Sequence, residues 1–71
     1  MRVKIGDGTL RREIKRGDFV EVVQKQHQRS GELTEGHVDR ILTSSAKHTR
    51  GIKVRLETGE VGRVQAIYEE E

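Results

Sequence analysis

The sequence contains no cysteine, no proline and no tryptophan, and only 3% of its residues are aromatic. The absence of cysteine excludes a disulfide framework and a thiolate metal site, and it suits a reducing compartment. No apolar run exceeds four residues, which excludes a transmembrane helix. The N-terminus lacks the apolar segment of a secretory signal. We therefore expect a cytoplasmic protein that does not contact a membrane.

What is present indicates a β-sheet domain. A chain of 71 residues fits one small domain with a thin core and excludes a multidomain enzyme. Valine and isoleucine supply 13 of the 22 hydrophobic residues, and β-branched side chains pack well on pleated sheets. Eight glycines divide the chain into short apolar segments. This pattern predicts an all-β fold, either a small sandwich or a barrel.

The chain divides into three segments. We predict a basic, unpaired N-terminal arm over residues 1–13, a barrel domain over residues 14–68 and an acidic tail over residues 69–71. Arg2 to Ile5 alternates like a short strand, and Leu10 to Ile14 is equally compatible with one helical turn.

Within the barrel domain, turn residues separate the predicted strands. Phe19–Val23 is the first secure strand, with Phe19 in the core, and the polar segment Gln24–Gly31 is a loop. The second strand lies within Leu33–Leu42, with Gly36 at a bulge or bend. Thr43–Gly51 is a loop of nine residues. Long loops in small domains are often functional.

The last hairpin is open to two registers. A two-residue turn at Thr58-Gly59 places Arg63 on the core face, whereas a three-residue loop with a left-handed Gly59 places it outside. A slip of one residue moves every side chain to the other face, so burial of apolar side chains selects the three-residue loop. In that register, four residues point inward: Ile52, Val54, Val64 and Ala66.

The same register predicts a basic surface. It makes Lys53 and Arg63 direct cross-strand neighbours, with Arg55 on the same face, and like charges in this position destabilise a sheet. Neutralisation by Glu57 or Glu60 and neutralisation by an external anion both remain open. Residues 24–55 carry a net charge of +4, which is compatible with a polyanion ligand and equally with a solvated charged face.

Three sequence elements resemble the SH3-like barrels of the KOW type, which occur in translation and transcription proteins. They are the apolar-x-x-Gly-Asp-apolar-Val-x-Val segment at 14–22, the Gly-x-Val-x-x-Ile segment at 36–41 and the Leu-Glu-Thr-Gly-Glu-Val hairpin at 56–61. This resemblance implies a small five-stranded SH3-like barrel.

A second resemblance covers residues 14–67. Ile-Leu-Thr-Ser-Ser at 41–45, Gly-Ile-Lys-Val-Arg-Leu at 51–56 and Gly-x-Val-Gly-Arg-Val-Gln at 59–65 are similar to the YwbE family of small bacterial and archaeal proteins. Where that family tends to have prolines and a second histidine, this chain has Ala46, Thr49 and Arg50. The resemblance implies no activity, no catalytic residues and no cofactor.

The residues also argue against several specific chemistries. Asp39, Ser44 and His48 lack the strained turn that a nucleophilic serine needs. The three histidines are ten and eleven residues apart, and this is not a local metal-ligand spacing, so we expect no metal and no enzyme. With two aromatic rings in the chain, stacking of nucleic-acid bases is limited and recognition must rely on phosphates.

We therefore expect a non-catalytic nucleic-acid-binding module, with RNA favoured by analogy with KOW-type barrels. The alternative is a protein-interaction module that uses a strand edge or the outward Val61. We expect a monomer. The candidate phosphate-binding residues comprise a central platform of Lys53, Arg55 and Arg63, one rim of Lys47, His48 and Arg50, and a second rim of Lys25 and Arg29.

Overall fold

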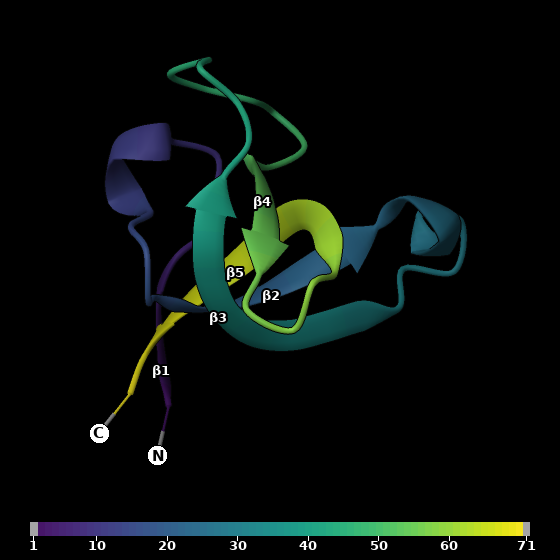
Figure 1. Ribbon diagram of the computed structural model, residues 1–71, viewed down its shortest axis with the longest axis horizontal. Helices are drawn as coiled ribbons and strands as arrows, with labels where there is room; N and C mark the ends of the chain where they lie inside the picture. Colours follow the sequence, from purple (N-terminus) through teal and green to yellow (C-terminus); the bar gives the residue numbers. More distant parts are fainter. Residues whose placement is uncertain (1, 71) are drawn as a thin grey trace.

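The computed structural model describes residues 2–70 and contains five strands and two short 3-10 helices (Figure 1). The residues it describes include no helix that is long and apolar enough to cross a membrane. The strands are β1 (Val3–Gly6), β2 (Phe19–Gln24), β3 (Leu33–Ile41), β4 (Lys53–Leu56) and β5 (Val61–Glu69), and the helices are η1 (Arg11–Glu13) and η2 (Lys25–His27).

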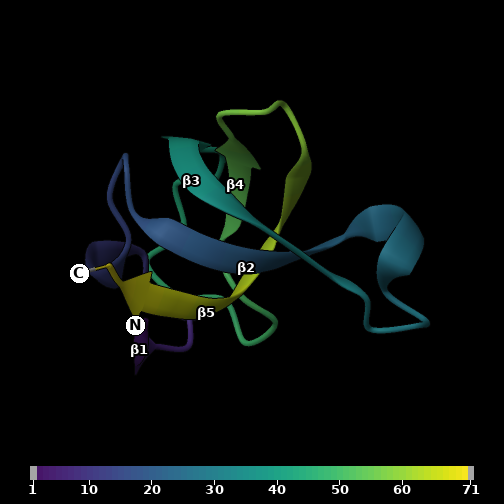
Figure 2. The ribbon, with the colours of Figure 1, turned by 90° about the horizontal axis from the view of Figure 1, so that it is seen from below.

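Four of the strands close into a barrel. All pairings are antiparallel, in the order β1-β5-β2-β3-β4, and an additional pairing of β4 with β5 completes the circuit. β1 is added outside this circuit, on β5. Figure 2 shows β2 beside β5 in the body of the barrel, with the connection between β2 and β3 projecting from one end. The prediction of a small all-β barrel is confirmed, with four strands closing the barrel and β1 added as the fifth strand.

The third strand bends sharply, as Figure 1 shows. Its first half pairs with β2 through His37, and its second half pairs with β4 from Val38 onward. Gly36 lies just before this change of partner, where an added Cβ would lie 3.1 Å from a methyl carbon of Leu56. The predicted bend near Gly36 is therefore present, while the irregularity in the pairing itself lies between Val38 and Arg40.

The core is almost entirely aliphatic. Its fully buried side chains come from β2, β3, β4, β5 and the residue that precedes β4, and Phe19 is 6% exposed at one end. The four residues predicted to point inward from the last hairpin are all buried. They confirm the predicted register. The buried hydrophobic residues are Ile14, Phe19, Val20, Val22, Val38, Ile52, Val54, Leu56, Val64, Ala66 and Ile67.

The first thirteen residues do not form the predicted unpaired arm. Val3 pairs with Glu69 and Lys4 with Tyr68, so β1 extends the sheet. The Arg2 guanidinium lies 3.7 Å from the centre of the Phe19 ring and 3.6 Å from Glu35. The prediction of an unpaired arm was wrong because the residues that this segment contacts are far away in the sequence, and no local pattern indicates them.

The predicted acidic tail is also partly structured. Glu69 ends β5, and Oε1 of Glu70 lies 2.6 Å from Nε2 of His37. Glu71 lies outside the described residues.

Candidate nucleic-acid interface

Lys53 and Arg63 face each other across the last hairpin, as the sequence predicted. The three-residue loop at 57–59 closes with Leu56 and Glu60 hydrogen-bonded, and Gly59 has a φ of 100°. Nη1 of Arg63 donates a hydrogen bond to the Gly51 carbonyl at 3.2 Å. Among residues 2–70, no acidic side chain lies within ion-pairing distance of Lys53 or Arg63. The repulsion between these two bases therefore lacks an internal counter-ion in this part of the chain.

Lys53 and Arg63 line a hollow between the 25–28 segment and the last hairpin. Lys25 joins Lys53 and Arg63 in its lining, and Glu60 is its one acidic residue. The Thr58 hydroxyl is hydrogen-bonded to Glu60 and lowers the pKa of that carboxyl, so the lining carries three positive charges against one negative charge at neutral pH. The lining residues are Val23, Gln24, Lys25, Gln26, Gln28, Lys53, Gly59, Glu60, Val61, Gly62 and Arg63.

A second hollow continues the first along β5. Both hollows are lined by Val23, Gln28 and Arg63, so Arg63 stands where they join. The second adds Arg50 and contains no acidic residue. We call the two joined hollows the basic groove. The lining residues of its second half are Val23, Gln28, Gly31, Leu33, Thr49, Arg50, Arg63 and Gln65.

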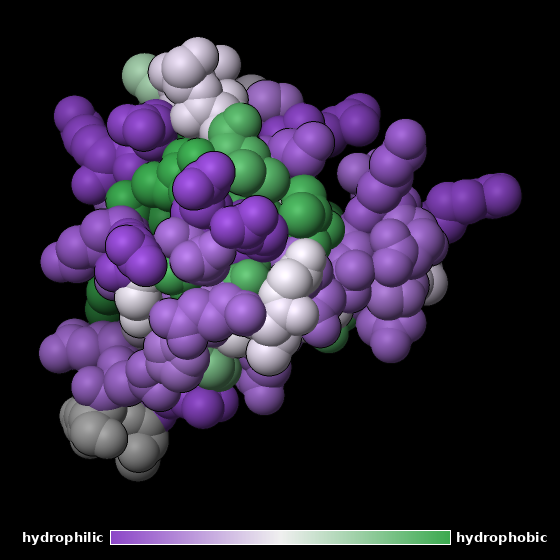
Figure 3. All heavy atoms as spheres, viewed as in Figure 1, coloured by the Kyte–Doolittle hydropathy of each residue, from purple (hydrophilic) through white to green (hydrophobic). Residues whose placement is uncertain are grey.

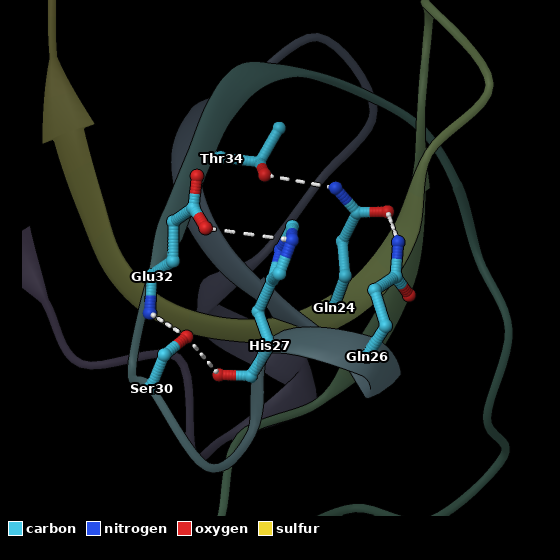
Figure 4. Close-up of polar contacts among 6 residues, drawn as sticks. All are labelled: Gln24, Gln26, His27, Ser30, Glu32 and Thr34. Carbon is cyan, nitrogen blue, oxygen red and sulfur yellow. Dashed lines mark hydrogen bonds and ion pairs between the residues drawn. The ribbon is translucent and has the colours of Figure 1, made fainter.

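The connection between β2 and β3 forms one wall of the basic groove, and its own polar contacts hold it in shape (Figure 4). The Gln24 and Gln26 side chains are hydrogen-bonded at 3.0 Å, and Gln24 also contacts the Thr34 hydroxyl at 2.9 Å. Nε2 of His27 lies 3.5 Å from Glu32. Figure 3 shows that this projecting segment is almost entirely hydrophilic.

Arg55 does not join the basic groove. Its guanidinium donates two hydrogen bonds to one oxygen of Asp39, from Nε at 3.1 Å and from Nη2 at 2.6 Å. Arg16 lies 3.9 Å from the other oxygen of that carboxylate. Arg55 is thus neutralised by Asp39 on β3, and not by Glu57 or Glu60 as one interpretation of the sequence supposed.

The bond from Arg55 also lowers the pKa of Asp39. A carboxyl whose pKa is lower in the folded state stabilises that state above its unfolded pKa, and this contribution is lost as the pH falls through the folded pKa. We expect wild type to have a higher Tm than Asp39→Asn above roughly pH 4, and the difference to shrink at lower pH. Thermal unfolding between about pH 2 and pH 7 measures this difference. A Tm difference that does not change with pH would contradict the assignment.

The remaining predicted rim residues lie outside the basic groove. Lys47 pairs with Leu10 and lines a separate hollow together with Arg11 and Arg12. The amide of His48 donates to the Thr9 carbonyl, and Nδ1 of His48 accepts the Arg50 amide at 3.1 Å. Arg29 is exposed and lines neither half of the groove. The structure therefore brings together four of the eight candidates: Lys25, Arg50, Lys53 and Arg63.

Glutamine side chains are the part of this surface that sequence reasoning missed. Gln24, Gln26 and Gln28 alternate along the chain, and with Gln65 they line the basic groove. The alternation was visible in the sequence, but only the fold brings these residues to Gln65. Among residues 2–70, no group of histidine, aspartate and glutamate side chains could hold a metal ion.

The fold and the groove define a small all-β barrel domain with a positively charged surface groove. The family described as "Uncharacterized conserved protein (DUF2196)" matches residues 7–67. The chain is also 49% identical, over 61 residues, to "Uncharacterized protein YwbE" of Bacillus subtilis (strain 168), and the match covers 86% of this chain and 94% of that protein. The chain therefore belongs to the DUF2196 family, and the resemblance to YwbE proteins is confirmed. No solved structure shows significant similarity to it.

Proposed function

We propose that this domain is a non-catalytic RNA-binding module that holds a phosphate backbone in the basic groove. The observation that carries the proposal is the Lys53–Arg63 pair. These two basic side chains lie opposite each other, have no acidic partner among residues 2–70 and line the same hollow as Lys25. An anion placed there relieves their repulsion. Phosphate contacts of this kind fix the position of a nucleic acid and are sequence-tolerant.

The choice of RNA follows the resemblance to KOW-type barrels, and it is an argument by analogy. The positive charge of the groove comes from only four side chains, which lie on three separate segments of the chain. Binding through these contacts is expected to weaken as the salt concentration rises, with a slope set by the small number of phosphates that are neutralised.

We expect the double variant Lys53→Gln/Arg63→Gln to bind a mixed-sequence RNA roughly tenfold more weakly. The slope of log affinity against log salt concentration should also fall by the amount that corresponds to about two phosphate contacts. Fluorescence anisotropy at about 50 mM and about 200 mM salt measures both quantities. Arg12→Gln/Arg40→Gln is the matched control, since it removes the same charge from two exposed residues outside the basic groove. Equal losses of RNA affinity in the two double variants would show that the groove contributes no more than general surface charge, and this would overturn the proposal.

A protein-interaction role is favoured by one observation. β1 stands at the end of the strand order, and Val3 and Ile5 are 47% and 56% exposed. An exposed strand edge is a template for an added strand. In this case a protein partner co-purifies after nuclease treatment and stays bound at moderate salt, which an RNA-bridged contact does not.

A further inference from the structure

The basic groove contains no aromatic ring on which a base could stack. Phe19 is buried, with the Arg2 guanidinium over its ring. The Tyr68 hydroxyl is hydrogen-bonded to Glu21, which raises the pKa of the tyrosine. Neither ring lines the groove. Stacking of bases on aromatic rings is therefore excluded in the groove, and hydrogen bonds to the base edges become the main route to base selectivity.

Gln65 offers a hydrogen-bonding group for this purpose whose orientation the structure fixes. Its Nε2 donates to the Arg50 carbonyl at 2.8 Å and to the carbonyls of Arg63 and Val64 at 3.2 Å. Carbonyl oxygens only accept hydrogen bonds, so the nitrogen of the amide must lie on that side. The other end, Oε1, is then an acceptor that no hydrogen bond among residues 2–70 engages.

The backbone places this acceptor at the groove. In the pairing of β2 with β5, Glu21 lies opposite Ala66 and Val22 opposite Val64, which leaves Gln65 as the extra residue of a bulge. Bulges redirect side chains and are common beside functional sites. Gln65 lines the second half of the groove together with Arg50 and Arg63, so its unengaged acceptor belongs to a surface that two positively charged side chains also line.

Base pairing restricts what Gln65 can contact. In a duplex, the Watson–Crick edges are hydrogen-bonded to the other strand and are not available to a side chain. A single strand can enter the groove, with its bases turned outward from the backbone.

From these observations we infer that the basic groove takes single-stranded RNA and that Oε1 of Gln65 selects bases carrying an exocyclic amino group. This inference rests on the RNA-binding function proposed above. Cytosine has an amino donor where uracil has a carbonyl acceptor. The amino group donates to Oε1 of Gln65, whereas the uracil carbonyl faces it as a second acceptor.

The test compares three RNA probes of about ten nucleotides, namely oligo(C), oligo(U) and a mixed-sequence duplex, by fluorescence anisotropy at low salt. We expect oligo(C) to bind at least about threefold more tightly than oligo(U), as one hydrogen bond implies, and both to bind more tightly than the duplex. Equal binding of oligo(C) and oligo(U), or tightest binding of the duplex, overturns this inference but leaves the proposed RNA-binding function standing. If none of the three binds, both are overturned.

Variants of Gln65 separate its part in selection from its part in the fold. Gln65→Lys keeps a donor for the Arg50 carbonyl but removes the acceptor, and Gln65→Met removes both. We expect the ratio of oligo(C) to oligo(U) affinity to fall to about one in both variants, whatever happens to affinity or stability as such. Ser45→Met, at an exposed position that lines neither half of the groove, is the control and should keep the ratio. An unchanged ratio in the Gln65 variants overturns the assignment to Gln65.

Discussion

Replacing Gly51 by alanine is expected to destabilise the domain by about 3–5 kcal/mol. Gly51 has a φ of 102°, and an added Cβ would lie 2.0 Å from the Val64 carbonyl oxygen. The substitution therefore combines an unfavourable backbone conformation with a clash against backbone atoms of β5. A domain of this size has a total stability of roughly 4–10 kcal/mol, so the substitution is expected to remove about a third or more of it.

Gly59→Ala is a close control for this prediction. Gly59 has nearly the same φ, 100°, but an added Cβ there meets nothing within 4 Å. We expect a loss of only about 1–2 kcal/mol, the cost of the left-handed conformation alone. Urea unfolding of the two variants gives the difference between them. If both lose the same stability, the close approach of Gly51 to β5 has no energetic consequence.

Substitution of Gly51 would also disturb the basic groove. The Gly51 carbonyl accepts the hydrogen bond from Arg63, and the neighbouring Arg50 carbonyl accepts the one from Gln65. The end of the 43–51 loop thus holds two groove side chains by their polar groups. Displacement of this backbone moves Arg50, Arg63 and Gln65 together.

The second large effect is expected in the core. Leu56→Ala should lower the free energy of unfolding by about 2–5 kcal/mol, because it leaves a cavity among side chains that cannot close over it. Leu56 is fully buried, lies opposite Val38 and packs closely against Gly36 in the bend of β3. Urea unfolding measures the loss, and an unchanged midpoint and slope would show that the barrel does not depend on this contact.

Val61→Ala provides the matched control on the same hairpin. Val61 is 36% exposed, and a change at an exposed position usually alters stability by no more than about 0.5 kcal/mol. The contrast tests whether burial, and not removal of an apolar side chain as such, determines the effect.

The last hairpin shows how much local information the sequence carried. Ile52 and Val54 alternate with charged residues, and Gly59 permits the left-handed turn. These features together allow one register in which the apolar side chains are buried. That register brings Lys53 opposite Arg63, so half of the candidate site could be predicted without coordinates.

Contacts between segments that are far apart in the sequence could not be predicted from local patterns. The pairing of β1 with β5 depends on residues about sixty positions apart along the chain, and no local pattern specifies it. The Arg55–Asp39 bond joins β4 to β3 across an irregular pairing, and it removes Arg55 from the platform on which the sequence alone placed it.

The sequence by itself thus determined the strand-rich class and the inward and outward faces of the last hairpin, because side-chain alternation and turn chemistry are local properties. The resemblance to YwbE proteins came from matching segments of sequence. Only the tertiary structure decided which basic side chains share a groove. Lys25, Arg50, Lys53 and Arg63 meet because η2, the 43–51 loop and the last hairpin converge as the barrel closes. Closure depends on packing between segments that are far apart in the chain, and the same packing places Gln65 in the lining of the groove and Arg55 beside Asp39.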